Sequence, residues 1–331
     1  MGHGRLVAFA AGFVVAACGP SPPPAPPASP PVPLHLTPAC DLVPAAGLSW
    51  LVEAKPRAIA QSVDLIPAIA TIIPENRFET FTTTHGGVDP RQIEDLCVSH
   101  YKGVTLTIAR TPIDSDKVID VFERRSSRPP ARTVLATNPA VTRVIGEVKD
   151  EKQGLIVFGR EELALEQGSG GPLRAAEAFA FGKLRRAQPA LRGAALSRAA
   201  DVVGDAPLRA FAPGPFEGET AQGLGGLLRA ATAVAISVVP VRGAARVAVR
   251  LVLTGAWGED APAAGERLAA AVHVLSESAI GKLFGLDRPL EGPRVRTAPE
   301  ALILEATYDA EVLARGVHDA VDAEVADIMR R

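Results

Sequence analysis

Two neighbouring segments, Thr232–Val239 and Arg246–Leu253, constrain the fold more than any other feature of the chain. Both are rich in β-branched residues, and Arg242-Gly243 between them is typical of a turn. In the second segment, apolar residues on one face alternate with residues on the other: Val247, Val249, Leu251 and Leu253 against Arg246, Ala248 and Arg250. This period of two predicts an antiparallel hairpin with one face in the core and the other at least partly wet.

The elements around this hairpin follow the same order in both halves of the chain: strand, helix, hairpin, helix, strand, helix. In the first half we expect strands at 48–53, 96–101, 104–110, 133–137, 141–148 and 155–159, and helices at 56–73, 90–94, 116–125, 172–187 and 189–200. In the second half we expect strands at 208–212, 232–239, 246–253 and 302–308, and helices at 219–229, at 260–283 and after Asp309.

This order predicts an α+β fold made of two related units, residues 38–200 and 201–331, with antiparallel sheets packed by helices. The repeat is one of element order rather than of aligned residues, so a coincidence stays open. The folded part also resembles uncharacterised bacterial envelope proteins built from duplicated α+β units. The motifs that carry this resemblance are Pro44-Ala45-Ala46, Gly87-Val88-Asp89-Pro90, and the segment from Asp201 to Pro207. The resemblance implies a fold and a location, and no mechanism.

The N-terminus has the pattern of an export signal. After Arg5, an apolar run extends from Leu6 to Ala17, which is shorter than the roughly 20 residues needed to cross a bilayer. We therefore interpret residues 1–17 as a signal peptide to be removed, with a retained signal-anchor as the weaker alternative. Val15-Ala16-Ala17-Cys18 resembles the lipobox of bacterial lipoproteins. That resemblance implies that Cys18 becomes the mature N-terminus and carries acyl chains, palmitate among them.

The alternative to the lipobox is an ordinary secretory signal in which Cys18 is incidental. The adjacent segment favours the lipobox, because residues 20–33 are mostly proline and favour an extended polyproline II conformation. Such a segment reaches roughly 45 Å at ~3.1 Å per residue. We interpret residues 18–37 as a lipidated cysteine and its tether. Gly19 is not the aspartate associated with inner-membrane retention, so the resemblance favours the periplasmic face of the outer membrane.

If Cys18 carries lipid, Cys40 and Cys97 remain as a pair. An oxidising cell envelope favours a disulfide between them. The bridge would close a loop of ~58 residues, with a stabilisation of up to about 4 kcal/mol. The alternative is two separate buried thiols.

Motifs for catalysis are sparse. The best local group is His85 with Gly86, Gly87 and Asp89, in which His85 and Asp89 are weak candidates for a proton relay. The same residues suffice to stop one helix and to cap the next. The chain has no HExxH, paired CxxC or Gly-x-Ser-x-Gly motif, so we expect no metal and no cofactor.

Composition excludes one class of partner. The net charge of −2 and pI near 6.3 provide no electrostatic basis for binding nucleic acid. The sequence therefore predicts a membrane-anchored envelope lipoprotein, a non-catalytic binding or scaffold module whose partner is an envelope protein or a lipid. The alternative is an envelope hydrolase with a dispersed active site, because catalytic residues need to meet only in space.

Overall fold

The computed structural model describes residues 30–184 and 187–330, with side chains up to Ala320. The chain divides into two units, residues 1–31 and residues 32–331, and we call the second of these the folded unit. Cys18 and the predicted signal peptide lie outside the described residues, as does Arg185-Arg186.

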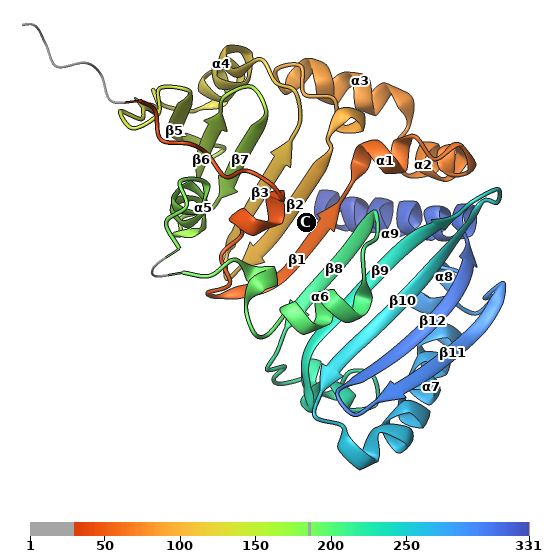
Figure 1. The fold of residues 1–331 in the computed structure, drawn as a ribbon. Coiled ribbons are helices and arrows are strands. Elements are labelled where there is room, and N and C mark those ends of the chain that lie inside the picture. The colour runs from red at the N-terminus through yellow and green to blue at the C-terminus, as the bar shows by residue number, and fades with distance from the viewer. Residues whose placement is uncertain (1–29, 185–186, 331) are drawn as a thin grey trace, which may run out of the picture. The chain divides into compact units, whose positions relative to one another are not determined.

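The strands of the folded unit form one antiparallel sheet (Figure 1). Across the part of the chain that is described, its order is β11-β12-β10-β9-β8-β1-β2-β3-β7-β6-β5-β4. The strand bounds are β1 (Leu48–Ala54), β2 (Asp95–Tyr101), β3 (Val104–Arg110), β4 (Ala131–Val134), β5 (Val141–Val148), β6 (Glu151–Phe158), β7 (Glu162–Gln167), β8 (Leu208–Pro213), β9 (Ala231–Val241), β10 (Arg246–Gly255), β11 (Glu291–Ala298) and β12 (Ala301–Asp309). With helices on both faces, the fold is α+β, as predicted.

The two halves meet where β1 pairs with β8, from Leu51 opposite Phe211 to Ala54 opposite Leu208. The sequence pattern predicted a separate sheet in each half, and this detail is wrong, because the sheets continue into each other. The physical reason is that β1 and β8 would otherwise be edge strands with unpaired backbone groups.

From this junction outward, the strand order is β1-β2-β3-β7-β6 in one direction and β8-β9-β10-β12-β11 in the other. The first half adds β5 and β4 at its edge. The common order concerns topology and aligns no residues, so the duplication stays a prediction. The predicted division after residue 200 lies inside helix α6 (Ser197–Val203).

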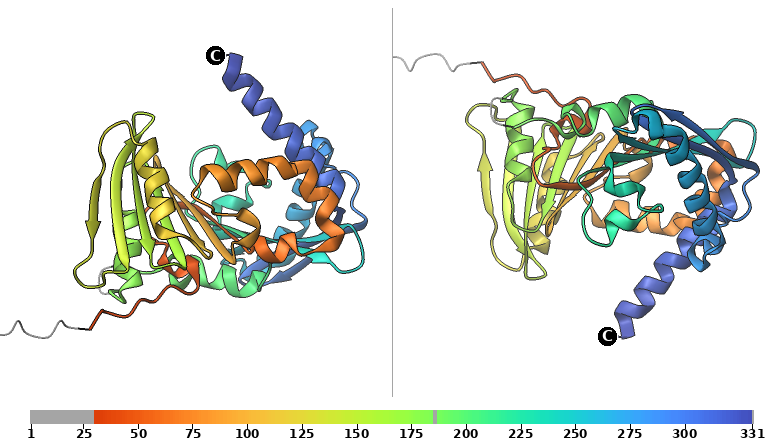
Figure 2. Two further views of the ribbon diagram at one scale, coloured as in Figure 1. Left: turned by 90° about the horizontal axis from the view of Figure 1, so that it is seen from above. Right: turned by 90° about the horizontal axis from the view of Figure 1, so that it is seen from below.

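Helices pack on both faces of the sheet, as the views in Figure 2 show. One face carries a short 3-10 helix, η1 (Ala39–Leu42), with α5 (Pro172–Ala180) and α6, over a core that includes Leu51, Leu106 and Phe211. The opposite face carries the remaining α-helices, which are α1 (Pro56–Ala60), α2 (Ile66–Ile72), α3 (Glu75–Thr84), α4 (Ser115–Arg125), α7 (Ala261–Glu277), α8 (Ala279–Leu283) and α9 (Ala310–Arg330). No helix among the described residues is long and apolar enough to span a membrane.

Several predicted elements differ from those observed. Strands β7 and β11 were not predicted, and the helix expected at 172–187 ends at Ala180. The helix expected at 219–229 is replaced by two 3-10 turns, η5 (Thr220–Gln222) and η6 (Leu227–Arg229), because Gly225 and Gly226 between them adopt positive φ.

The long helix expected from Asp260 divides at Ser278, whose hydroxyl accepts a hydrogen bond from the amide of Gly281 at the start of α8. The side chain of Asp260 makes no capping bond to α7, whereas Asp309 accepts bonds from two amides of α9, as expected.

Residues 32–43, here called the lead segment, lie along the folded unit. The amide of Val32 donates to Thr137 O at 3.0 Å, and the amide of His35 donates to Ala180 O at 2.7 Å. Leu34 and Leu36 pack against the core. The predicted tether of residues 18–37 is therefore too long, because its last six residues belong to the folded unit.

The lead segment includes a disulfide between Cys40 and Cys97, whose Cα atoms are 5.3 Å apart. Both cysteines are buried, and Cys97 lies in β2 near the centre of the sheet. The structure thus forms the bridge that the cysteine count predicts, and it fixes the lead segment to an interior strand.

Replacing Cys40 and Cys97 together by alanine is expected to lower the free energy of unfolding by about 2–4 kcal/mol, because the unfolded chain regains the freedom of a 57-residue loop. Urea denaturation of the oxidised wild type and the double variant measures this difference. Unreduced peptide mapping that finds both thiols free would contradict the bridge.

Candidate functional site

His85 lies at the C-terminal end of α3, and its neighbours hold it there. Its ring stacks on Phe81 with centroids 3.9 Å apart, and Nδ1 is 3.0 Å from Phe81 O and 3.0 Å from Thr84 Oγ1. Burial is the main cause that lowers the pKa of His85. These contacts hold the ring of His85 against the last turn of α3.

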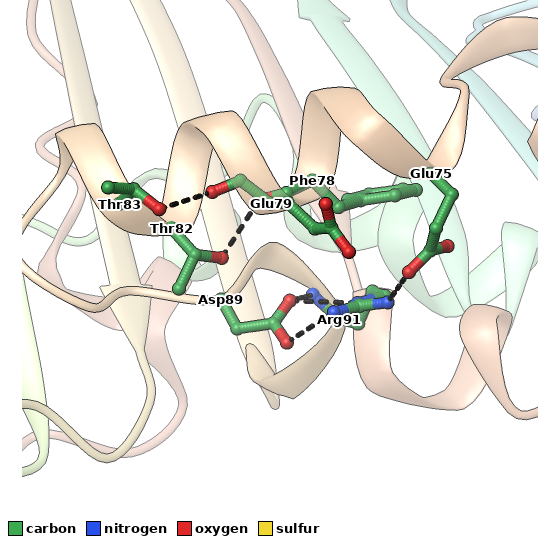
Figure 3. Close-up of polar contacts among 7 residues, drawn as sticks. All are labelled: Glu75, Phe78, Glu79, Thr82, Thr83, Asp89 and Arg91. Carbon is green, nitrogen blue, oxygen red and sulfur yellow. Dashed lines mark hydrogen bonds and ion pairs between the residues drawn. The ribbon is translucent and has the colours of Figure 1, made fainter.

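Asp89 has different neighbours (Figure 3). It caps the 3-10 helix η3 (Pro90–Gln92) by accepting from the amide of Arg91 at 2.9 Å, and it accepts from Arg91 Nε and Nη2 at 3.0 Å each. The Arg91 guanidinium lowers the pKa of Asp89, pairs with Glu75, and lies 5.3 Å from the Phe78 ring. The structure thus engages Asp89 and His85 in separate local contacts, and the expectation that neither weak candidate is catalytic stays a prediction.

A first hollow, of about 410 Å³, lies between the end of α3 and helix α4. It is lined by Thr82, Thr83, Gly86, Gly87, Lys117, Asp120, Val121 and Arg124. Its two threonine hydroxyls already donate to the carbonyls of Phe78 and Glu79, at 2.9 Å each (Figure 3). These two hydroxyls therefore have no proton left to donate to a ligand, although each can still accept a hydrogen bond.

A second hollow, of about 500 Å³, lies between the C-terminal end of α6 and strand β11, and we call it the α6–β11 hollow. Its lining residues are Val203, Gly204, Asp205, Ser237, Val239, Ala248, Val249, Arg250, Glu291, Gly292, Arg294, Glu305, Ala306 and Thr307. They come from α6, the loop after it, and strands β9 to β12.

Ion pairs hold two of the charged side chains that line the α6–β11 hollow, Arg250 and Glu305. Arg250 Nε donates to Glu305 Oε1 at 2.8 Å, and Arg250 Nη1 donates to Val203 O at 3.1 Å. Arg296 Nη2 donates to the same Glu305 oxygen at 2.7 Å. The guanidinium of Arg250 is therefore held from two sides, by a neighbouring strand and by the last turn of α6.

These residues belong to a polar row that crosses six strands in register. From β11 to β1, the Cα partners are Arg294, Glu305, Arg250, Ser237, Arg209 and Glu53. At its inner end, Arg209 Nε donates to Glu53 Oε2 at 3.0 Å, and Arg209 Nη1 donates to Gly204 O at 3.1 Å. The row thus connects the hollow to the junction between the two halves.

Glu162 is the most strongly perturbed carboxyl group among the described residues, and it lines neither hollow. It is fully buried, and both of its carboxyl oxygens lack a hydrogen-bond partner within the described chain. Burial raises the pKa of Glu162 to about 8, against a lowering by Arg110. Its position in the core gives it consequences for stability rather than for binding.

The sequence pattern predicted Arg250 on the wet face of its hairpin, but it did not predict the hollow. Arg294 and Glu291 lie in β11, which was not predicted, and Ser237 and Glu305 meet Arg250 only through the strand register. The one signal in the sequence that pointed to this hollow was the presence of charged residues of both signs on the wet faces of several strands.

Within residues 30–184 and 187–330, no group of three or more His, Cys, Asp or Glu side chains could hold a metal ion.

Comparisons with known proteins identify no family for this chain. No protein-family model matches the sequence, and no curated protein matches it.

Solved structures of TP0453 in three crystal forms are similar to the chain. Form III has 11% identity and a TM-score of 0.48, and covers 85% of this chain and 97% of TP0453. Form IV has 10% identity and a TM-score of 0.47, and covers 83% of this chain and 96% of TP0453. Form I has 9% identity and a TM-score of 0.49, and covers 86% of this chain and 98% of TP0453. These values are too low to carry an argument about function.

Proposed function

We propose that this protein is a lipid-anchored protein of the bacterial cell envelope, and that its folded unit is a non-catalytic binding module. The observation that carries the proposal is the attachment of the lead segment. The Cys40–Cys97 bridge and the hydrogen bonds of Val32 and His35 fix this segment to the sheet. Firm attachment is useful where a chain that begins at a lipidated Cys18 must hold a domain at a membrane.

The α6–β11 hollow is the proposed binding site of the module. Its lining includes no histidine or cysteine among the described residues, and its central arginine, Arg250, is bound to Glu305 and to a backbone carbonyl. Groups held in this way are suited to recognising a polar ligand with little rearrangement.

The alternative, a hydrolase, requires a nucleophile beside a base. The acid with the most altered pKa in the described chain, Glu162, lies outside both hollows. The hydrolase therefore stays a prediction from the sequence, without a site in its favour.

Replacing Cys18 by serine is expected to move the protein from the membrane fraction to the soluble fraction, because serine cannot take the thioether-linked lipid that the lipobox resemblance implies. Several acyl chains anchor a protein stably, whereas a single chain binds only marginally. Immunoblotting of membrane and soluble fractions measures the change.

Cys40→Ser is the matched control, because it removes a cysteine from the folded unit and leaves Cys18 in place. It should stay with the membrane. A Cys18→Ser variant that fractionates like the wild type would overturn the lipid anchor.

A further inference from the structure

We propose that the α6–β11 hollow binds an oxyanion, that is, a small molecule carrying a phosphate or carboxylate group. This inference rests on the proposed function as a binding module and names the class of its ligand.

The charge in the hollow favours such a ligand. Glu305 is shared between Arg250 and Arg296, whose guanidinium groups both donate to the same carboxylate oxygen. A third guanidinium, that of Arg294, is the cross-strand neighbour of Glu305 and has no polar partner among the described residues. Arg250 and Arg294 line the hollow itself, and Arg296 lies beside it. Arginine is the side chain best suited to bind phosphate or carboxylate groups.

Hydroxyl donors on the floor of the hollow favour the same ligand. Ser237 and Thr307 are only 3% and 8% exposed, and their side chains make no hydrogen bond with another described residue. Both lie in strands beside Arg250 or Glu305 and line the hollow. Neither oxygen is among the buried side-chain atoms that lack a partner, so both hydroxyls are accessible and can donate to a ligand that accepts hydrogen bonds in the hollow.

The acids at the rim set a limit on the affinity. Asp205 is paired with Lys55 at 2.7 Å, which cancels its charge. Glu291 is exposed, opposes Thr307 in register, and has no cationic partner in the described chain. The lining alone has two arginines and three acids, and the positive charges outnumber the negative ones only when the neighbouring Lys55 and Arg296 are counted. The hollow is therefore expected to bind an oxyanion weakly and in a salt-dependent manner.

The volume agrees with a small ligand. Pockets for small molecules are typically about 300–1,000 Å³, and the α6–β11 hollow of about 500 Å³ lies within this range.

Isothermal titration calorimetry tests the proposal with two probes, inorganic phosphate and citrate, added to the full-length protein at low ionic strength and neutral pH. At least one probe should bind the wild type, and Arg294→Gln should weaken that binding about tenfold, because it removes a charge-assisted donor. Glu291→Gln should tighten it a few-fold, because it removes a repulsive charge. Arg288→Gln is the control, since Arg288 is exposed and does not line the hollow.

No binding of either probe up to about 10 mM, an affinity of about −3 kcal/mol, would refute the oxyanion. Equal losses in Arg294→Gln and Arg288→Gln would show an unspecific charge effect and would also refute it. Neither result would affect the lipid anchor, which Cys18→Ser tests separately. Conversely, probe binding with the expected variant pattern would keep the site even if Cys18→Ser stayed with the membrane.

Discussion

Replacing Glu162 by glutamine is expected to make the protein ~3–5 kcal/mol more stable than the wild type at pH 9, and to leave its stability at pH 4.5 within ~1 kcal/mol. Glu162 is fully buried in β7, and neither of its carboxyl oxygens has a partner among the described residues. The folded protein therefore favours the neutral acid, which glutamine imitates at every pH.

The direction follows from the pKa values of the two states. The ordinary pKa of the carboxyl group is 4.5, and burial raises it to about 8 in the folded protein. Below pH 4.5 the carboxyl group is neutral in both the folded and the unfolded protein, and its contribution to stability is fully present. As the pH rises to about 8, the unfolded chain loses this proton more readily than the folded protein, so that contribution is lost. Arg110, the cross-strand neighbour, opposes the shift, while Asp95 and Glu161 add to it.

Urea denaturation of the two proteins between pH 4.5 and 9 measures the effect. Glu151→Gln is the control, because Glu151 is exposed and does not contribute to the pKa shift of Glu162. Its stability curve should run parallel to that of the wild type. Parallel curves for Glu162→Gln as well would show that the carboxyl group is solvated in the folded state.

Replacing Glu53 by alanine is expected to lower the free energy of unfolding by ~3–5 kcal/mol, because it leaves the Arg209 cation buried without its counter-ion. The side chains of Glu53 and Arg209 are only 9% and 15% exposed. They join β1 to β8, so the loss falls on the pairing between the two halves of the sheet.

The double replacement Glu53→Leu with Arg209→Met removes both charges and keeps the buried site filled with side chains of similar volume. Apolar residues of similar volume often replace a buried ion pair at little cost, so the double variant should recover most of the lost stability. Glu94→Ala is the control, since it removes a half-exposed partner of Arg57 and Arg110 and should cost under ~1 kcal/mol. A Glu53→Ala variant as stable as the control would mean that the junction does not depend on this pair.

Local patterns in the sequence predicted much of the fold. The hairpin of β9 and β10 follows from alternating side chains and an Arg-Gly turn, and the hairpin of β2 and β3 turns at Lys102-Gly103 between the two predicted strands. Strand β11 was missed because Gly292 and Pro293 interrupt it and most of its residues are exposed. Such an edge strand has no apolar face for a pattern to reveal.

The site depends on longer-range geometry, and this explains why the sequence did not predict it. Ser237, Arg250 and Glu305 lie far apart in the chain, and they meet because β9, β10 and β12 pair in one register. A shift of one residue would turn each side chain to the other face. By contrast, His85 and Asp89 formed a compact local group, and the structure engages both in contacts at helix ends.

The anchor at Cys18 is the central claim, and mass spectrometry of the N-terminal peptide of protein purified from membranes tests it most directly. We predict a peptide that begins at Cys18 and whose mass includes acyl chains. A peptide that begins at Met1, or one that contains Cys18 as an unmodified thiol within the chain, would contradict the lipid anchor.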